Sequence, residues 1–117
     1  MRYIVLLISS GMITHLYASD ELLNKKIQFL LTQVKQTKCQ VERNGQVYNG
    51  EKAAGHIQRK YDYYKKKIDS IDRFIALSAT KSLMSGKYYL IRCPGKPEQR
   101  LADWLRARIA EFKAAKN

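Results

Sequence analysis

The chain has 117 residues, of which 22 are Lys or Arg and 10 are Asp or Glu, so its formal net charge at pH 7 is +12. This length is sufficient for one domain and excludes a second domain of ordinary size. The excess of basic residues favours anionic partners, because a positive long-range field attracts them.

The first 18 residues have the pattern of a secretory signal peptide. Arg2 supplies a positive charge, Ile4 to Ile13 is mainly apolar, and Ala18 offers a small residue for cleavage. A retained membrane anchor is the alternative, but a spanning helix needs roughly 20 apolar residues, and this run is much shorter. We therefore expect a periplasmic or secreted protein, in which residues 1–18 are removed, residues 19–117 form a single domain, and no transmembrane span is left.

Both cysteines, Cys39 and Cys93, lie in the predicted exported part of the chain. An oxidising compartment favours a disulfide between them. In the chain-entropy model, closing a loop of this length stabilises the folded state by about 4 kcal/mol. A nucleophilic thiol is the competing interpretation, but it would leave the other cysteine without a role. We therefore predict a disulfide between Cys39 and Cys93.

The predicted elements begin with an amphipathic helix that Asp20 can cap and that extends to about Gln36. Two short alternating runs then flank Asn44-Gly45, which predicts a β-hairpin because a type I′ turn needs positive φ at both central positions. This register places Val41 opposite Tyr48. A second helix begins at Glu51, and a break is expected near residue 69. A further helical segment follows, which Ser70 can cap.

Residues 87–93 are rich in β-favouring side chains and predict a third strand, in which Tyr89, Ile91 and Cys93 share one face. Pro97 suits the first turn of a last helix, and an apolar stripe that includes Trp104 follows it. The order α-β-β-α-α-β-α predicts an α+β fold, a small antiparallel three-stranded sheet with about four helices packed on it. The disulfide is expected to tie the first strand to the third.

The sequence offers few residues for catalysis or metal binding. His56 is the only histidine after the predicted signal peptide, whereas a transition-metal site usually needs several His or Cys ligands. We therefore expect no metal and no cofactor. Residues 78–81 match the S-x-x-K signature of serine acyl-transfer enzymes, but the partner motifs are missing, and chance explains the match in a lysine-rich chain.

Basic residues cluster on the second predicted helix. Basic charge beside an aromatic residue such as Tyr63 marks a nucleic-acid surface when it is concentrated on one face. The consecutive lysines at 65–67 instead fan around roughly 200° of a helix, and Asp62 and Asp69 lie beside them. This pattern favours an ordinary solvated surface, and we expect no nucleic-acid partner.

Several short motifs occur in a fixed order from about residue 21 to residue 106. They are Cys39-x-Val41-x-Arg43-Asn44-Gly45, Ala53-Ala54-x-His56-Ile57-x-x-Lys60, Phe74-Ile75, Ala79-Thr80-Lys81-Ser82, Ser85-Gly86-Lys87-x-Tyr89-x-Ile91 and Trp104-Leu105. On these motifs the chain resembles the YfeK-like proteins, a family of small exported bacterial proteins with no assigned activity. Tyr88 departs from the family pattern, in which proline precedes the tyrosine. The resemblance implies a bacterial origin, export and one compact domain.

The resemblance also singles out polar residues that a fold alone would not require. The candidate anion-binding or ligand-binding residues are Arg43, His56, Lys60, Lys81, Ser82 and Ser85. His56 and Lys60 lie one helical turn apart and share a face, so Lys81 and Ser82 could complete a pocket for a carboxylate or phosphate. A structural role is the alternative for several of these residues, because the loop before the third strand explains Ser85 and a helix hydrogen bond could explain His56.

These observations favour a non-enzymatic binding or accessory protein that takes an anionic envelope ligand or an envelope protein partner. A small hydrolase or transferase that uses His56 with Ser82 or Lys81 is the alternative, and it requires those side chains within hydrogen-bond reach. A purely structural envelope component is a third interpretation, which predicts an exposed apolar patch larger than a few hundred Å².

Overall fold

The computed structural model describes residues 20–116, with side chains described up to residue 112. The predicted signal peptide, residues 1–18, lies outside the described residues. The first helix covers residues 20–36 of the described chain. The elements that follow are β1 (Gln40–Arg43), β2 (Gln46–Tyr48), α2 (Gly50–Tyr64), a 3₁₀ turn (Lys65–Lys67), α3 (Ile71–Ser78), β3 (Leu90–Arg92), β4 (Gln99–Arg100) and α4 (Leu101–Lys116).

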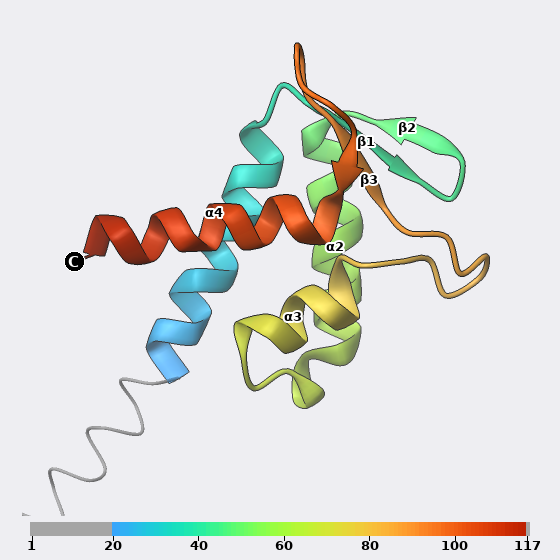
Figure 1. Ribbon diagram of the computed structural model, residues 1–117. Helices are drawn as coiled ribbons and strands as arrows, with labels where there is room; N and C mark the ends of the chain where they lie inside the picture. The colour runs from blue at the N-terminus through green and yellow to red at the C-terminus, as the bar shows by residue number, and fades with distance from the viewer. Residues whose placement is uncertain (1–19, 117) are drawn as a thin grey trace, which may run out of the picture.

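The sheet is antiparallel throughout and has the strand order β2-β1-β3-β4. The helices pack against it and against one another, and α4 runs across the first helix (Figure 1), where the rings of Phe29 and Phe112 lie 5.0 Å apart. The α+β class is therefore confirmed, whereas the predicted count of three strands is one too few. Among the described residues, no helix has the length and apolar character needed to cross a membrane.

The hairpin forms with the predicted turn and register. Asn44 and Gly45 have φ values of 54° and 81°, the left-handed conformation that a type I′ turn requires at both positions. Val41 pairs with Tyr48. The turn also fixes which side chains of β1 face the helices, because Val41 is buried and Arg43, two residues later, projects from the same side of the strand.

The second helix starts directly after the hairpin and packs tightly against the first helix. The Asn49 side chain caps it by accepting a hydrogen bond from the backbone N–H of Lys52 at 2.9 Å. A Cβ atom at Gly50 would lie 2.2 Å from the backbone oxygen of Val34, so only glycine fits there. The predicted break is present, and Ser70 caps α3 by accepting from the N–H of Arg73.

The fourth strand is a feature that the sequence analysis missed. Gln99 and Arg100 pair with Ile91 and Leu90 before α4 begins, and the N–H of Leu101 donates to the carbonyl of Tyr89 at 2.9 Å. The expectation that Pro97 lies in the first turn of the last helix is therefore wrong. Gln99 and Arg100 give the free edge of β3 its backbone partners. A strand of two residues is too short to show an alternating pattern in the sequence.

The predicted disulfide between Cys39 and Cys93 is confirmed. The two residues directly flank the paired strands β1 and β3, in which Gln40 faces Arg92 and Val41 faces Ile91. The disulfide therefore closes one end of the strand pair at the centre of the sheet. Val41 and Ile91 are buried beneath it in the same core as the apolar stripes of the helices.

Candidate anion-binding site

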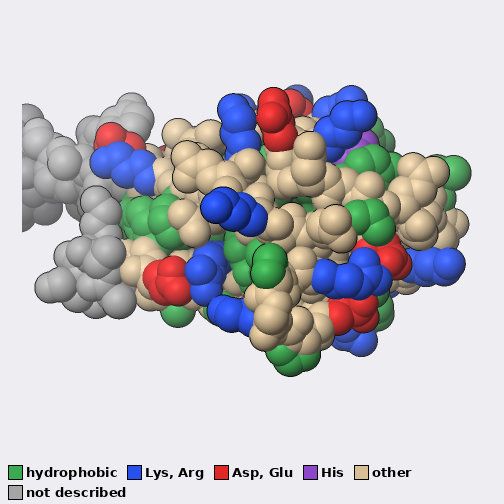
Figure 2. Space-filling view, turned by 90° about the horizontal axis from the view of Figure 1, so that it is seen from above, with side chains coloured by type: hydrophobic (Ala, Val, Ile, Leu, Met, Phe, Trp, Pro, Cys, Tyr) green, Lys and Arg blue, Asp and Glu red, His purple; other side chains and the backbone are tan. Residues whose placement is uncertain are grey.

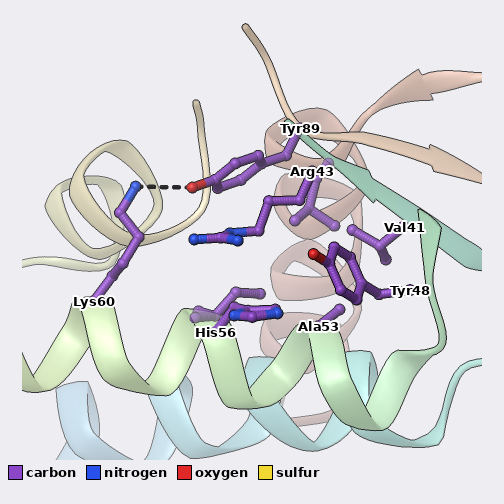
Figure 3. A pocket seen from close by; sticks show the side chains of 9 residues that line it. Val41, Arg43, Tyr48, Ala53, His56, Lys60 and Tyr89 are labelled. Carbon is purple, nitrogen blue, oxygen red and sulfur yellow. Dashed lines mark hydrogen bonds between the residues drawn. The ribbon is translucent and has the colours of Figure 1, made fainter. Parts of the chain in front are cut away.

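A small cavity lies between the sheet and α2, where polar side chains from four segments converge (Figure 3). Arg43 reaches in from the end of β1, Tyr48 from β2, His56 and Lys60 from α2, and Tyr89 from the residue before β3. The cavity has a volume of about 10 Å³, which is about the space that one water molecule needs. Its remaining walls are apolar side chains: Val41, Ala53, Ile57 and Leu101.

An open groove of about 330 Å³ lies beside this cavity and shares Arg43, His56 and Lys60 with it. The remaining lining residues of this groove are Arg59, Tyr63, Tyr64 and Leu83. We call it the basic groove. It is large enough to admit a phosphate or carboxylate group.

The ammonium group of Lys60 is held in place by two hydrogen bonds. Its Nζ donates to the backbone oxygen of Lys81 and to the Tyr89 hydroxyl, each at 3.0 Å (Figure 3). An ammonium group has three N–H donors, so these two contacts fix its position and leave one donor for a ligand. Lys60 is therefore a positioned cation, in contrast to the mobile lysines of an ordinary surface.

The imidazole of His56 is surrounded by cations. Its Nδ1 accepts a hydrogen bond from Nη2 of Arg59 at 3.0 Å, and its ring lies edge-on to Tyr48 with centroids 4.8 Å apart. Burial and then the charges of Arg43, Arg59 and Lys52 lower the pKa of His56 below its ordinary value of 6.5. At neutral pH the ring is uncharged, and since Nδ1 accepts, Nε2 carries the proton and can donate it to an anion.

Arg43 offers a buried donor on the wall of the basic groove. Its Nε is buried and makes no hydrogen bond to any described residue, although a buried donor without a partner is unfavourable by about 1–3 kcal/mol. Its guanidinium points into the space above His56, between Tyr48 and Lys60 (Figure 3). An anion in that space would supply the missing acceptor.

The cations of the basic groove also lack acidic partners. Within the described part of the chain, no salt bridge joins Arg43, Arg59 or Lys60 to a carboxylate, whereas four other basic residues are paired in this way. The pairs are Lys25 with Glu21, Arg92 with Glu42 and Glu98, Arg106 with Asp103, and Arg108 with Glu111. On the face seen in Figure 2, Lys and Arg side chains lie among Asp and Glu side chains.

The structure brings together three of the residues singled out by sequence, Arg43, His56 and Lys60. Lys81 contacts this group through its backbone oxygen only. The hydroxyl of Ser82 accepts from the N–H groups of Met84 and Ser85. Ser82 therefore orders the loop that it begins and does not line the groove.

Ser85 acts in the same way, because its hydroxyl accepts from the backbone N–H of Lys87 at 3.3 Å. Among the described residues, His56 forms no hydrogen bond with Ser82 or Lys81, the contact that the hydrolase interpretation needs. The described residues also contain no group of three His, Cys, Asp or Glu side chains that could hold a metal ion.

Among the lining residues that sequence reasoning did not assign to a site are Tyr48, Arg59, Tyr64 and Tyr89. Arg59 could have been found, because it lies three residues after His56 and so on the same side of the helix. Tyr48 was placed opposite Val41 by the hairpin register, but the register alone does not show that its ring packs against a helix.

Comparison with known proteins gives a family and no function. No curated protein and no solved structure matches the chain significantly. A family of unknown function, DUF5329, matches residues 22–113, a span that contains every residue of the basic groove. The chain belongs to the DUF5329 family.

Proposed function

We propose that the protein is a non-enzymatic binding or accessory protein of the bacterial envelope that holds an anionic ligand in the basic groove. The observation that carries the proposal is the convergence of Arg43, Arg59 and Lys60 around a neutral histidine with no carboxylate among them. Arginine matches the oxygen pairs of phosphate and carboxylate, and lysine adds a compact point charge.

The electrostatics of the basic groove favour this proposal. Like charges held close together repel, and near a protein surface a pair of unit charges 4 Å apart interacts by about 4 kcal/mol. A bound anion replaces this repulsion by attraction to each cation and also gives the buried Nε of Arg43 an acceptor. The electrostatic energy of the groove is therefore more favourable with a bound anion than with water alone.

The envelope location is part of the proposal. The disulfide supports it, because such bonds persist in oxidising compartments and are rare in the cytosol, and the signal-like first 18 residues point the same way. Kinship with the YfeK-like proteins is proposed on the shared motifs and would add a further argument for export.

A titration of oxidised protein with pyrophosphate tests the proposal by calorimetry at physiological ionic strength. Arg43→Gln should weaken binding at least tenfold, since a charge-assisted hydrogen bond contributes about 1.5–3 kcal/mol. Arg106→Gln is the matched control, because it removes the same charge from a surface arginine that pairs with Asp103. We expect it to change the affinity by less than about twofold, since exposed charges at a distance are screened.

Equal losses in the two variants would show that only the net charge attracts the anion, and the proposed groove would then be wrong. An absence of binding to pyrophosphate, inorganic phosphate and citrate alike would reject the proposal altogether.

A further inference from the structure

The loop of residues 82–86, between α3 and β3, presents two adjacent large apolar side chains to solvent. Leu83 is 73% exposed and Met84 is 91% exposed. The loop projects away from the helices on the same side of the molecule as the β1–β2 hairpin (Figure 1). Single exposed apolar residues are common on proteins; here two of them are adjacent at the tip of one loop.

The loop is ordered by its own hydrogen bonds. The N–H of Ser82 donates to the oxygen of Lys87, and the N–H of Gly86 donates to the oxygen of Ser82, both at 2.9 Å. The Ser82 hydroxyl accepts from the N–H of Met84 and from the next residue, and a bridge pairs Lys81 with Tyr88. The fold therefore holds Leu83 and Met84 in an outward position.

Basic and aromatic side chains surround this tip. Lys81 and Lys87 flank it and are exposed, and Leu83 itself lines the basic groove. Tyr63, on the rim of the groove, is 81% exposed. No acidic residue occurs between Asp72 and Glu98 in the sequence, so the loop and both of its flanks carry positive charge only.

We propose that this loop and the basic groove together dock the protein on an anionic lipid bilayer. Leu83 and Met84 enter the boundary between headgroups and acyl chains, while Lys81, Lys87 and the groove contact lipid phosphates. Apolar side chains inside a basic collar are the combination that binds such surfaces, since insertion and charge attraction add. Exposed tyrosines such as Tyr63 suit the headgroup region.

This inference rests on the proposed function, because it names the headgroup of an anionic lipid as the anion that the groove takes. Charge complementarity selects this partner. An apolar tip alone would suit another protein equally well, whereas exposed lysines on both sides of it and the basic groove beside it match a uniformly negative surface.

Sedimentation with lipid vesicles tests the inference. Oxidised protein without the predicted signal peptide, residues 1–18, should bind vesicles of phosphatidylethanolamine and phosphatidylglycerol and should not bind vesicles of phosphatidylcholine. The double variant Leu83→Ser with Met84→Ser should lower the partition coefficient at least tenfold, because transfer of one Leu side chain out of water alone accounts for about that factor. Leu22→Ser is the control, since Leu22 is 42% exposed on the first helix and should change partitioning by less than about twofold.

The single variant Met84→Ser leaves every lining residue of the basic groove in place. It should therefore weaken vesicle binding but still bind pyrophosphate in solution with wild-type affinity, and the melting temperatures of both variants should match that of the wild type. Binding of the double variant to anionic vesicles at wild-type strength, or wild-type binding that ignores phosphatidylglycerol, would overturn the membrane proposal. The pyrophosphate titration is independent of this result and judges the groove by itself.

Discussion

Replacing both cysteines, Cys39→Ala with Cys93→Ala, removes the covalent link between the ends of β1 and β3. The cysteines are separated by 54 positions in the sequence, and in the chain-entropy model opening a loop of that size lowers the free energy of unfolding by about 4 kcal/mol. The pairing that remains between these strands consists of three residue pairs. Against a typical total stability of about 5–15 kcal/mol, this loss should leave the variant marginally folded.

Urea unfolding followed by circular dichroism measures this loss. With a urea m-value of about 1–3 kcal/mol/M, the variant midpoint should lie between about 1 and 4 M below that of the oxidised wild type. Reductant should produce the same shift in the wild type and none in the double variant. A difference in unfolding free energy below about 1 kcal/mol would refute the reasoning that the loop closure stabilises this sheet.

Three further substitutions test other parts of the structure. Gly50→Ala should lower the free energy of unfolding by about 2 kcal/mol or more, because its Cβ would meet the backbone oxygen of Val34. Gly55→Ala is the control: no atom lies near its Cβ position, so this substitution should raise the free energy of unfolding by about 0.5–1 kcal/mol. Thermal unfolding of the two variants measures the difference. Arg43→Gln should not reduce stability without ligand and should raise it by up to about 1 kcal/mol, since the buried Nε has no partner, and a clear fall in melting temperature would contradict this view of the site. The pKa of His56 is lowered in the folded protein, so on acidification the unfolded chain takes up a proton first and the free energy of unfolding should fall as the pH drops below about 6.5. His56→Gln should make the free energy of unfolding depend less on pH in this range. An equal pH dependence in both proteins would show that His56 contributes nothing to it.

Much of the fold was predictable because its signals are local. Asn44-Gly45 specifies its turn by the φ values that it permits, and Ser70 specifies a helix start by the hydrogen bond that its side chain accepts. The disulfide followed from the number of cysteines and the expected compartment. In contrast, β4 forms by pairing with the free edge of β3. That edge is a tertiary feature, and the two residues of β4 carry no sequence pattern that predicts the pairing.

The site divides in the same way. His56 and Lys60 share a helix face at a spacing that sequence shows directly, and Arg43 was singled out by the resemblance. The walls of the groove come from segments far apart in the chain, so the roles of Tyr48 and Tyr89 required the packed structure. Ser82 was assigned to the ligand, but local geometry gives its hydroxyl two backbone donors within its own loop.

The most direct test of the account is an NMR measurement of the pKa of His56 in oxidised protein, without and with saturating pyrophosphate. Burial of the ring and then the cations around it should hold the pKa of His56 below 6.5 in the free protein. An anion among Arg43, Arg59 and Lys60 offsets those charges, so the pKa of His56 should be higher in the bound protein. A pKa that pyrophosphate leaves unchanged, while the protein still binds it, would place the anion elsewhere and contradict the assignment of the groove.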